Sequence, residues 1–164
     1  AGDRYGLSLE HLTIEDNFNP EMGFLRREDY RRNYALVRFS PRPQRIPWIR
    51  KIGWLGSLDY IANNRGQLES RLAQATTRIE LENGDEWRTD FEREFEWLAE
   101  PFEVGEGVAI PVGAYGFNNL RSAYTLGPQR RVSGTMTIER GAFYGGDRTT
   151  ASYRGRVEIS PRPR

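Results

Sequence analysis

The chain has 164 residues, long enough for one domain, and its 37% hydrophobic and 29% charged residues are typical of a soluble protein. Its formal charge of +1, with Arg spread beside nearly equal numbers of acids, gives no reason to expect nucleic acid as a partner, and the absence of cysteine excludes disulfides and thiolate sites. A mean hydropathy of −0.73 excludes helical membrane spans but not membrane strands, because a barrel with a wet interior is hydrophilic on average.

Alternation of apolar and polar residues predicts eight strands and no helix. In chain order the strands span residues 5–14, 31–40, 48–61, 67–82, 86–98, 114–126, 132–140 and 148–160. Several exceed the roughly 5 to 6 residues usual in soluble domains and reach the roughly 9 to 11 that a membrane strand needs. We predict an all-β, antiparallel, up-and-down meander that is part or all of a transmembrane-type β-barrel, with residues 1–164 as one domain or a fragment of a larger barrel.

The clearest strand, residues 86–97, has two unlike faces. Charged residues alternate without a break with a mostly apolar row. Trp87 and Trp97 end this row about 25 Å apart on a tilted strand, which matches the apolar band of an outer-membrane barrel. Arg93 lies midway between them, where it would cost about 2 to 4 kcal/mol at the bilayer midplane. A shifted band, a protein partner or a soluble sheet would each explain Arg93.

Hairpin turns between neighbouring strands support the meander. A three-residue loop over 83–85 predicts three pairs: Leu81 with Trp87, Glu80 with Arg88, and Arg78 with Asp90. A loop over 127–131 pairs Leu126 with Val132. A neighbouring register lets Tyr153 cover Gly134, which protects a strand glycine.

The connections at the two ends of the predicted sheet differ in length. One end collects the compact segments 40–45, 83–85, 127–131 and 160–164. The other end collects 15–30, 62–66, 99–113 and 141–147, which are longer on average. Short turns on one side and long loops on the other are typical of outer-membrane barrels, in which the short turns are periplasmic.

The strand pattern assigns side chains to a watery interior and to an aromatic rim. Charged residues predicted to line the interior are Arg78, Glu80, Arg88, Asp90, Glu92, Glu94, Glu96, Arg154 and Arg156. Aromatic residues predicted to lie at the lipid-facing rims are Trp48, Trp54, Tyr60, Trp87 and Trp97.

The carboxylates do not form a convincing active site. Glu92, Glu94 and Glu96 share a face at about 7 Å spacing, within the roughly 5 to 9.5 Å of glycosidase acid pairs. Any strand with alternating Glu offers such pairs, so interior lining is the better interpretation and we assign no catalytic residue. His11 is the only histidine, which leaves few ways to build a metal site or a catalytic triad. We expect no metal or cofactor, and a non-enzymatic role is favoured.

Two loops carry candidate recognition residues. They combine aromatic faces with short polar groups, which suits stacking on a sugar or packing on another loop that closes the barrel mouth. The candidates are Phe18, Asn19, Glu21, Phe143, Tyr144 and Asp147. The acidic residues there lack the spacing of a known calcium motif.

Four stretches, 18–43, 55–61, 100–117 and 129–149, resemble an uncharacterised bacterial family, the domain of unknown function 5916. The most specific motifs are FNPE-x-GF-x-RR, IPVG-x-Y, and RRVSG followed by FYGGDR. In that family a carbohydrate-binding domain of the family-nine-like type precedes a large C-terminal barrel domain of unknown function. The resemblance implies part of that barrel, which is expected to exceed eight strands, and supplies no catalytic residues.

These observations together predict an outer-membrane-type β-barrel segment of a bacterial envelope protein. Its role would be structural or transport-related and linked to carbohydrate handling. Its partners would be the outer-membrane bilayer, carbohydrate, and the remaining strands or domains of the parent protein. The alternative is a soluble β-sheet module, periplasmic or secreted, that binds or processes glycans, with the Trp and Phe row as its core.

Overall fold

The computed structural model describes residues 4–17, 29–105, 108–143 and 146–158. Within them the chain forms strands and no helix that could span a membrane. The strands are β1 (Tyr5–Ile14), β2 (Tyr30–Phe39), β3 (Ile49–Asn63), β4 (Leu68–Leu81), β5 (Glu86–Leu98), β6 (Phe102–Gly105), β7 (Val108–Ile110), β8 (Gly113–Leu126), β9 (Val132–Phe143) and β10 (Gly146–Val157).

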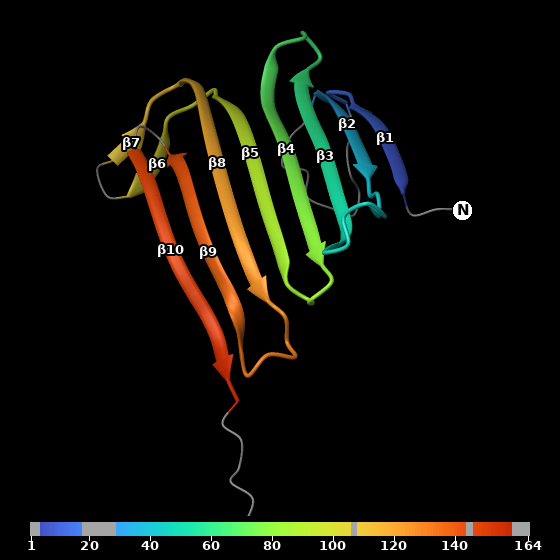
Figure 1. Cartoon of the computed structure of the whole chain (residues 1–164). Coiled ribbons are helices and arrows are strands. Elements are labelled where there is room, and N and C mark those ends of the chain that lie inside the picture. The colour runs from blue at the N-terminus through green and yellow to red at the C-terminus, as the bar shows by residue number, and fades with distance from the viewer. Residues whose placement is uncertain (1–3, 18–28, 106–107, 144–145, 159–164) are drawn as a thin grey trace, which may run out of the picture.

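Eight long strands form one antiparallel sheet in the order β1-β2-β3-β4-β5-β8-β9-β10 (Figure 1). Each strand pairs with its neighbours along the chain, so β1 and β10 are the two edges. The short strands β6 and β7 pair with each other in a separate hairpin between β5 and β8. The all-β, antiparallel, up-and-down meander of about eight long strands is therefore confirmed. The β6–β7 hairpin lies in the segment expected to be a loop.

The β4–β5 hairpin differs from the predicted register by two residues. Ile79, not Leu81, pairs with Trp87, and the predicted oppositely charged pairs are replaced by Glu80 with Glu86 and Arg78 with Arg88. The loop has the predicted length but covers residues 82–84, because Leu81 N–H donates to Asp85 O at 2.9 Å. Gly84 takes the left-handed φ of 81° that closes such a loop, and glycine adopts this conformation without steric cost.

The β8–β9 register is also shifted by two residues. Leu126 pairs with Gly134 rather than with Val132, because Val132 and Ser133 extend beyond β8 to pair with β10. Tyr153 does cover Gly134 as predicted: a Cβ on Gly134 would lie 3.0 Å from the Tyr153 hydroxyl. A shift of two residues preserves the face of every side chain, so the assignment of faces is unaffected.

The sheet is a single layer without a conventional core (Figure 1). Among the described residues the buried hydrophobic side chains are Ile49, Ala62 and Ile110. No described large side chain is completely buried. Both faces of the sheet are therefore free of a covering protein layer in the part of the chain that the structure describes.

Candidate functional site

The two faces of the main sheet carry different side chains. Paired residues on neighbouring strands share a face, so the registers assign each strand residue to one side. We call the side with Trp87, Phe91 and Trp97 the apolar face, and the opposite side the polar face. Other large members of the apolar face are Tyr5, Leu7, Leu9, Val37, Phe39, Trp54, Leu58, Ile79, Leu120, Tyr124, Met136, Ile138, Tyr153 and Val157.

Large side chains on the apolar face are mostly exposed. Leu9 is 71% exposed, Ile138 62% and Trp87 50%. Among the exposed large hydrophobic residues of the described main sheet, only Leu12 and Leu55 lie on the polar face. An apolar surface that extends across eight strands is far larger than soluble monomers leave uncovered, which marks it as a contact surface.

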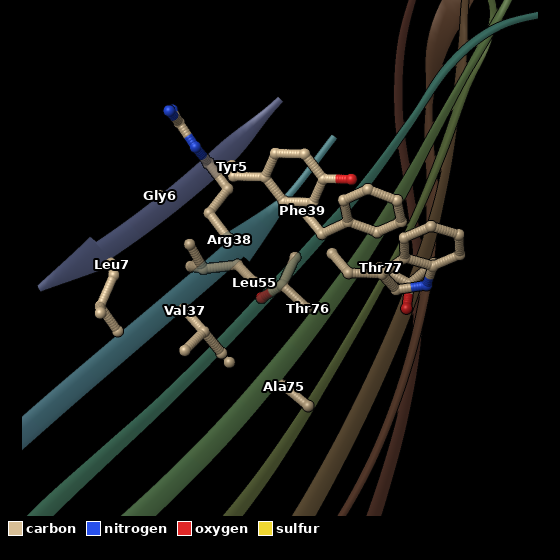
Figure 2. A pocket seen from close by; sticks show the side chains of 12 residues that line it. Tyr5, Gly6, Leu7, Val37, Arg38, Phe39, Leu55, Ala75, Thr76 and Thr77 are labelled. Carbon is tan, nitrogen blue, oxygen red and sulfur yellow. The ribbon is translucent and has the colours of Figure 1, made fainter. Parts of the chain in front are cut away.

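A shallow hollow of about 630 Å³ lies on the apolar face near the short-turn end (Figure 2). The rings of Tyr5, Phe39 and Trp54 stack in sequence along its border, with centroids 5.1 and 5.5 Å apart. Gly56 and Ala75 form its floor. The hollow is therefore apolar, with an aromatic row at the edge nearest the turns.

The predicted rim residues lie at two levels of the sheet. Trp54 and Trp87 lie on the apolar face near the short-turn end, and Tyr60 and Trp97 lie on the same face near the loop end. Trp48 precedes β3 and is 61% exposed. The structure thus places aromatic residues toward both ends of the apolar face.

Polar side chains cross the apolar face along an oblique line. The line has three levels, each made of residues that lie opposite one another on neighbouring strands. The first level contains His11, Asn33 and Arg71, the second contains Arg93 and Asn118, and the third contains Arg140 and Thr149. Each level lies two residues closer to the short-turn end of the sheet than the level before it. The apolar region between this line and the short-turn end therefore shifts along the strands from β1 to β10.

His11 is part of this line and is fully hydrogen-bonded. Its Nδ1 lies 2.7 Å from Asn33 Oδ1, and its Nε2 lies 3.1 Å from the Thr13 hydroxyl. Within the described residues no group of three His, Cys, Asp or Glu side chains could hold a metal ion. His11 thus occupies a polar strand position.

The polar face carries most of the ion pairs. Arg32 binds Asp59 through two nitrogens, at 2.6 and 2.9 Å, and Arg88 binds Asp90 at 2.8 Å. Arg148 binds Glu139 at 2.9 Å. All nine residues predicted to line an interior lie on this face: Arg78, Glu80, Arg88, Asp90, Glu92, Glu94, Glu96, Arg154 and Arg156.

A hollow of about 410 Å³ on the polar face contains part of the carboxylate row. Glu92 and Glu94 line it together with Phe117 and Asn119. Gln74 donates to Glu92 at 2.9 Å, whereas the Asn119 Oδ1 is buried and accepts no hydrogen bond from the described residues. This hollow combines an aromatic ring with several hydrogen-bond acceptors.

Asp85, treated in the sequence only as a turn residue, is the most buried polar side chain described. It accepts hydrogen bonds from Gly127 N–H at 2.8 Å, the Tyr124 hydroxyl at 2.9 Å and Arg130 at 2.7 Å. The predicted meander already brings the 83–85 loop beside the 127–131 loop. The sequence signal that could have predicted this contact is Asp85 in one loop and Arg130 and Arg131 in the next.

Four of the six predicted recognition residues belong to segments outside the described part of the chain. Phe18, Asn19, Glu21 and Tyr144 lie outside the described residues. Phe143 ends β9, and Asp147 is an exposed residue of β10 on the apolar face, opposite Ala142. The strands β9 and β10 therefore extend into the 141–147 segment that was expected to be a loop.

Compared with protein-family models, with curated proteins and with solved structures, the chain has no match.

Proposed function

We propose that this chain is a segment of an outer-membrane-type β-barrel in a bacterial envelope protein. The exposed apolar face is the observation that carries the proposal. A single-layer sheet leaves side chains such as Leu9, Trp87 and Ile138 without a protein cover. Removing one such side chain from water is worth about 1.5 to 3 kcal/mol, so the face needs an apolar neighbour along its whole extent. Lipid provides one.

The oblique polar line supports the tilt that a barrel requires. Barrel strands tilt by about 35 to 45°, so a band level with the membrane crosses them obliquely. On this arrangement Arg93 lies at the border of the apolar band, opposite Asn118, rather than at its centre. A long Arg side chain at such a border reaches the headgroups. This placement corresponds to the shifted band in which Arg93 snorkels, and it puts Phe95 and Trp97 on the loop side of the border.

Strand length and loop asymmetry support the same assignment. The eight main strands contain 10 to 15 residues, enough to cross a bilayer when tilted. The two longest connections, 15–29 and 99–112, lie at one end, which also has the short connections 64–67 and 144–145, whereas the opposite end has 40–48, 82–85 and 127–131. We assign the short-turn end to the periplasm.

The polar face would line the interior, with a structural or transport role linked to carbohydrate. Its ion pairs neutralise the charges that face the lumen, and barrel interiors are polar in this way. The 410 Å³ hollow is lined by Glu92 and Glu94, whose carboxylates are acceptors that suit sugar hydroxyls. The resemblance to proteins with a carbohydrate-binding domain favours the same solute class.

The alternative is a soluble sheet that binds or processes glycans. It would need the apolar face to be a core. Buried hydrophobic side chains among the described residues amount to Ile49, Ala62 and Ile110, so the sheet does not provide that core itself. This observation favours lipid.

The test is membrane fractionation of the parent protein, with SDS electrophoresis of boiled and unboiled samples. We expect it to stay in the carbonate-washed outer membrane and to migrate faster unboiled. A protein that is soluble without detergent and shows no heat-dependent shift would contradict the proposal and make glycan binding the next hypothesis.

A further inference from the structure

Some arginines of the sheet have partners and others do not. On the polar face Arg32, Arg88 and Arg148 are each paired with a carboxylate, whereas Arg38 and Arg154 make no hydrogen bond or ion pair with a described residue. On the apolar face Arg71, Arg93 and Arg140 make no hydrogen bond or ion pair with any described residue. Arg93 and Arg140 are exposed, and Arg71 is half-buried. No described carboxylate is paired with any of these three cations, although Asp147 lies near Arg140 on the surface that we assign to lipid.

Successive arginines of this line lie close enough to act on one ligand, whereas Arg71 and Arg140 are three strands and four residues apart, about 20 Å between backbones. Arg71 and Arg93 are diagonal neighbours on β4 and β5, a separation of about 7 to 8 Å between backbones. Arg140 is two strands from Arg93, and neighbouring strands are about 4.8 Å apart. Long side chains can converge over these distances. Three like charges without an anion repel one another, so an anionic ligand would stabilise the sheet.

The surroundings of this line suit a ligand that is charged at one end and apolar at the other. A hollow of about 270 Å³ beside Arg140 is lined by Phe91, Leu120 and Asn118. Asp147 also lines it, but no ion pair joins Asp147 to Arg140. The arginines follow the loop-side border of the apolar band, and Leu120 lies on the apolar face directly opposite Arg140.

We infer that Arg71, Arg93 and Arg140 bind the phosphate groups of a phosphorylated lipid in the leaflet on the loop side. The inference rests on the proposed function, because it requires the apolar face to meet lipid. Guanidinium groups form paired, charge-assisted hydrogen bonds with phosphate, and the acyl chains would lie on the apolar face around Leu120.

The experiment measures lipid retained by the detergent-purified protein in native mass spectrometry. The probes are lipid A and chemically dephosphorylated lipid A at equal concentration. We expect the protein to retain lipid A at least about tenfold better, and Arg93→Gln with Arg140→Gln to lower that retention by about tenfold or more. Arg65→Gln, which removes an exposed charge from a loop-side turn, should stay within about twofold.

Three results would overturn the inference. Equal retention of both lipids, or retention unchanged in the double variant, would do so while the barrel proposal stands. Inorganic phosphate that displaces lipid A at equal concentration would indicate a site for free anions. Absence of the parent protein from carbonate-washed membranes would contradict the proposed function and this inference together, and that readout is independent of lipid retention.

Discussion

Asp85 connects two turns at the short-turn end. It is 3% exposed and is held by Gly127, Tyr124 and Arg130. Burial raises the pKa of this carboxyl, but the Gly127 and Tyr124 hydrogen bonds and the Arg130 charge outweigh burial and leave its pKa below the ordinary value. A buried carboxylate with this many donors is a strong local constraint on the hairpin ends.

Replacing Asp85 with Ala should destabilise the fold. The change leaves buried donors without an acceptor, which costs about 1 to 3 kcal/mol. Chemical unfolding in detergent micelles, followed by tryptophan fluorescence, measures the loss. Glu82→Ala, at an exposed position of the same turn, is the control and should change the free energy of unfolding by less than about 0.5 kcal/mol. Equal effects of the two changes would contradict the role of Asp85.

The contribution of Asp85 should depend on pH. Because its pKa is lower in the folded state, the unfolded chain binds more protons below about pH 4, so stability falls as the pH falls. The advantage of the native protein over Asp85→Asn should be complete above about pH 5 and shrink as the pH drops through the folded pKa. A difference in unfolding free energy that is constant over this range would be inconsistent with a lowered pKa.

At the scale of elements, strand positions were predictable but registers were not. A period of two in the sequence identifies a strand and its faces, as in residues 86–97. It does not distinguish registers two residues apart, because both keep every side chain on its face. Two residues select the observed register of β4 with β5: Gly84, whose left-handed φ fixes the loop at 82–84, and the buried Asp85. The β6–β7 hairpin is short and lacked a clear alternation.

Gly134→Ala should weaken the pairing of β9 with β10. A Cβ there would lie 2.5 Å from the Arg154 carbonyl oxygen and from the Gly155 Cα, and neither backbone atom can move aside. We expect a loss of about 1 to 3 kcal/mol in unfolding free energy. Gly116→Ala on β8 is the matched control, because its Cβ would meet its nearest neighbour at an ordinary 3.9 Å. Similar stability of both variants would contradict this packing.

A new charge should destabilise the protein much more on the apolar face of β4 than on its polar face. Ala75 and Gln74 are exposed neighbours, on the apolar and polar faces respectively. In a bilayer Ala75→Arg should cost about 2 to 4 kcal/mol, whereas Gln74→Arg should cost about 1 kcal/mol or less. Guanidinium unfolding from lipid vesicles measures both. If Ala75→Arg is as harmless as an exposed substitution in water, the apolar face does not meet lipid.

At the scale of the molecule, the face on which each side chain lies was predictable. The offset of each strand relative to its neighbours across the sheet was not. All nine charged residues assigned to the interior share the polar face. The oblique line through Arg71, Arg93 and Arg140 depends on the mutual offset of four strands, which no single segment encodes. Asp85 was missed for the same reason, since its partners belong to a turn forty residues away.

The open edges bear on the size of the proposed barrel. The strands β1 and β10 each pair on one side, and β10 is exposed at every residue. Unpaired backbone groups are not tolerated in lipid, so the proposal requires each edge to pair, either with the other edge or with remaining strands of the parent protein.

The most direct test of lipid contact is spin labelling of β5. The chain has no cysteine, so single cysteines at residues 87 to 97 carry unique labels. In vesicles, positions 87, 89 and 91 should be accessible to oxygen and shielded from a water-soluble nickel reagent, and even-numbered positions should show the reverse. If positions 87, 89 and 91 are closed to both reagents, or open to nickel, the account is contradicted, because the apolar face would then meet protein or water instead of lipid.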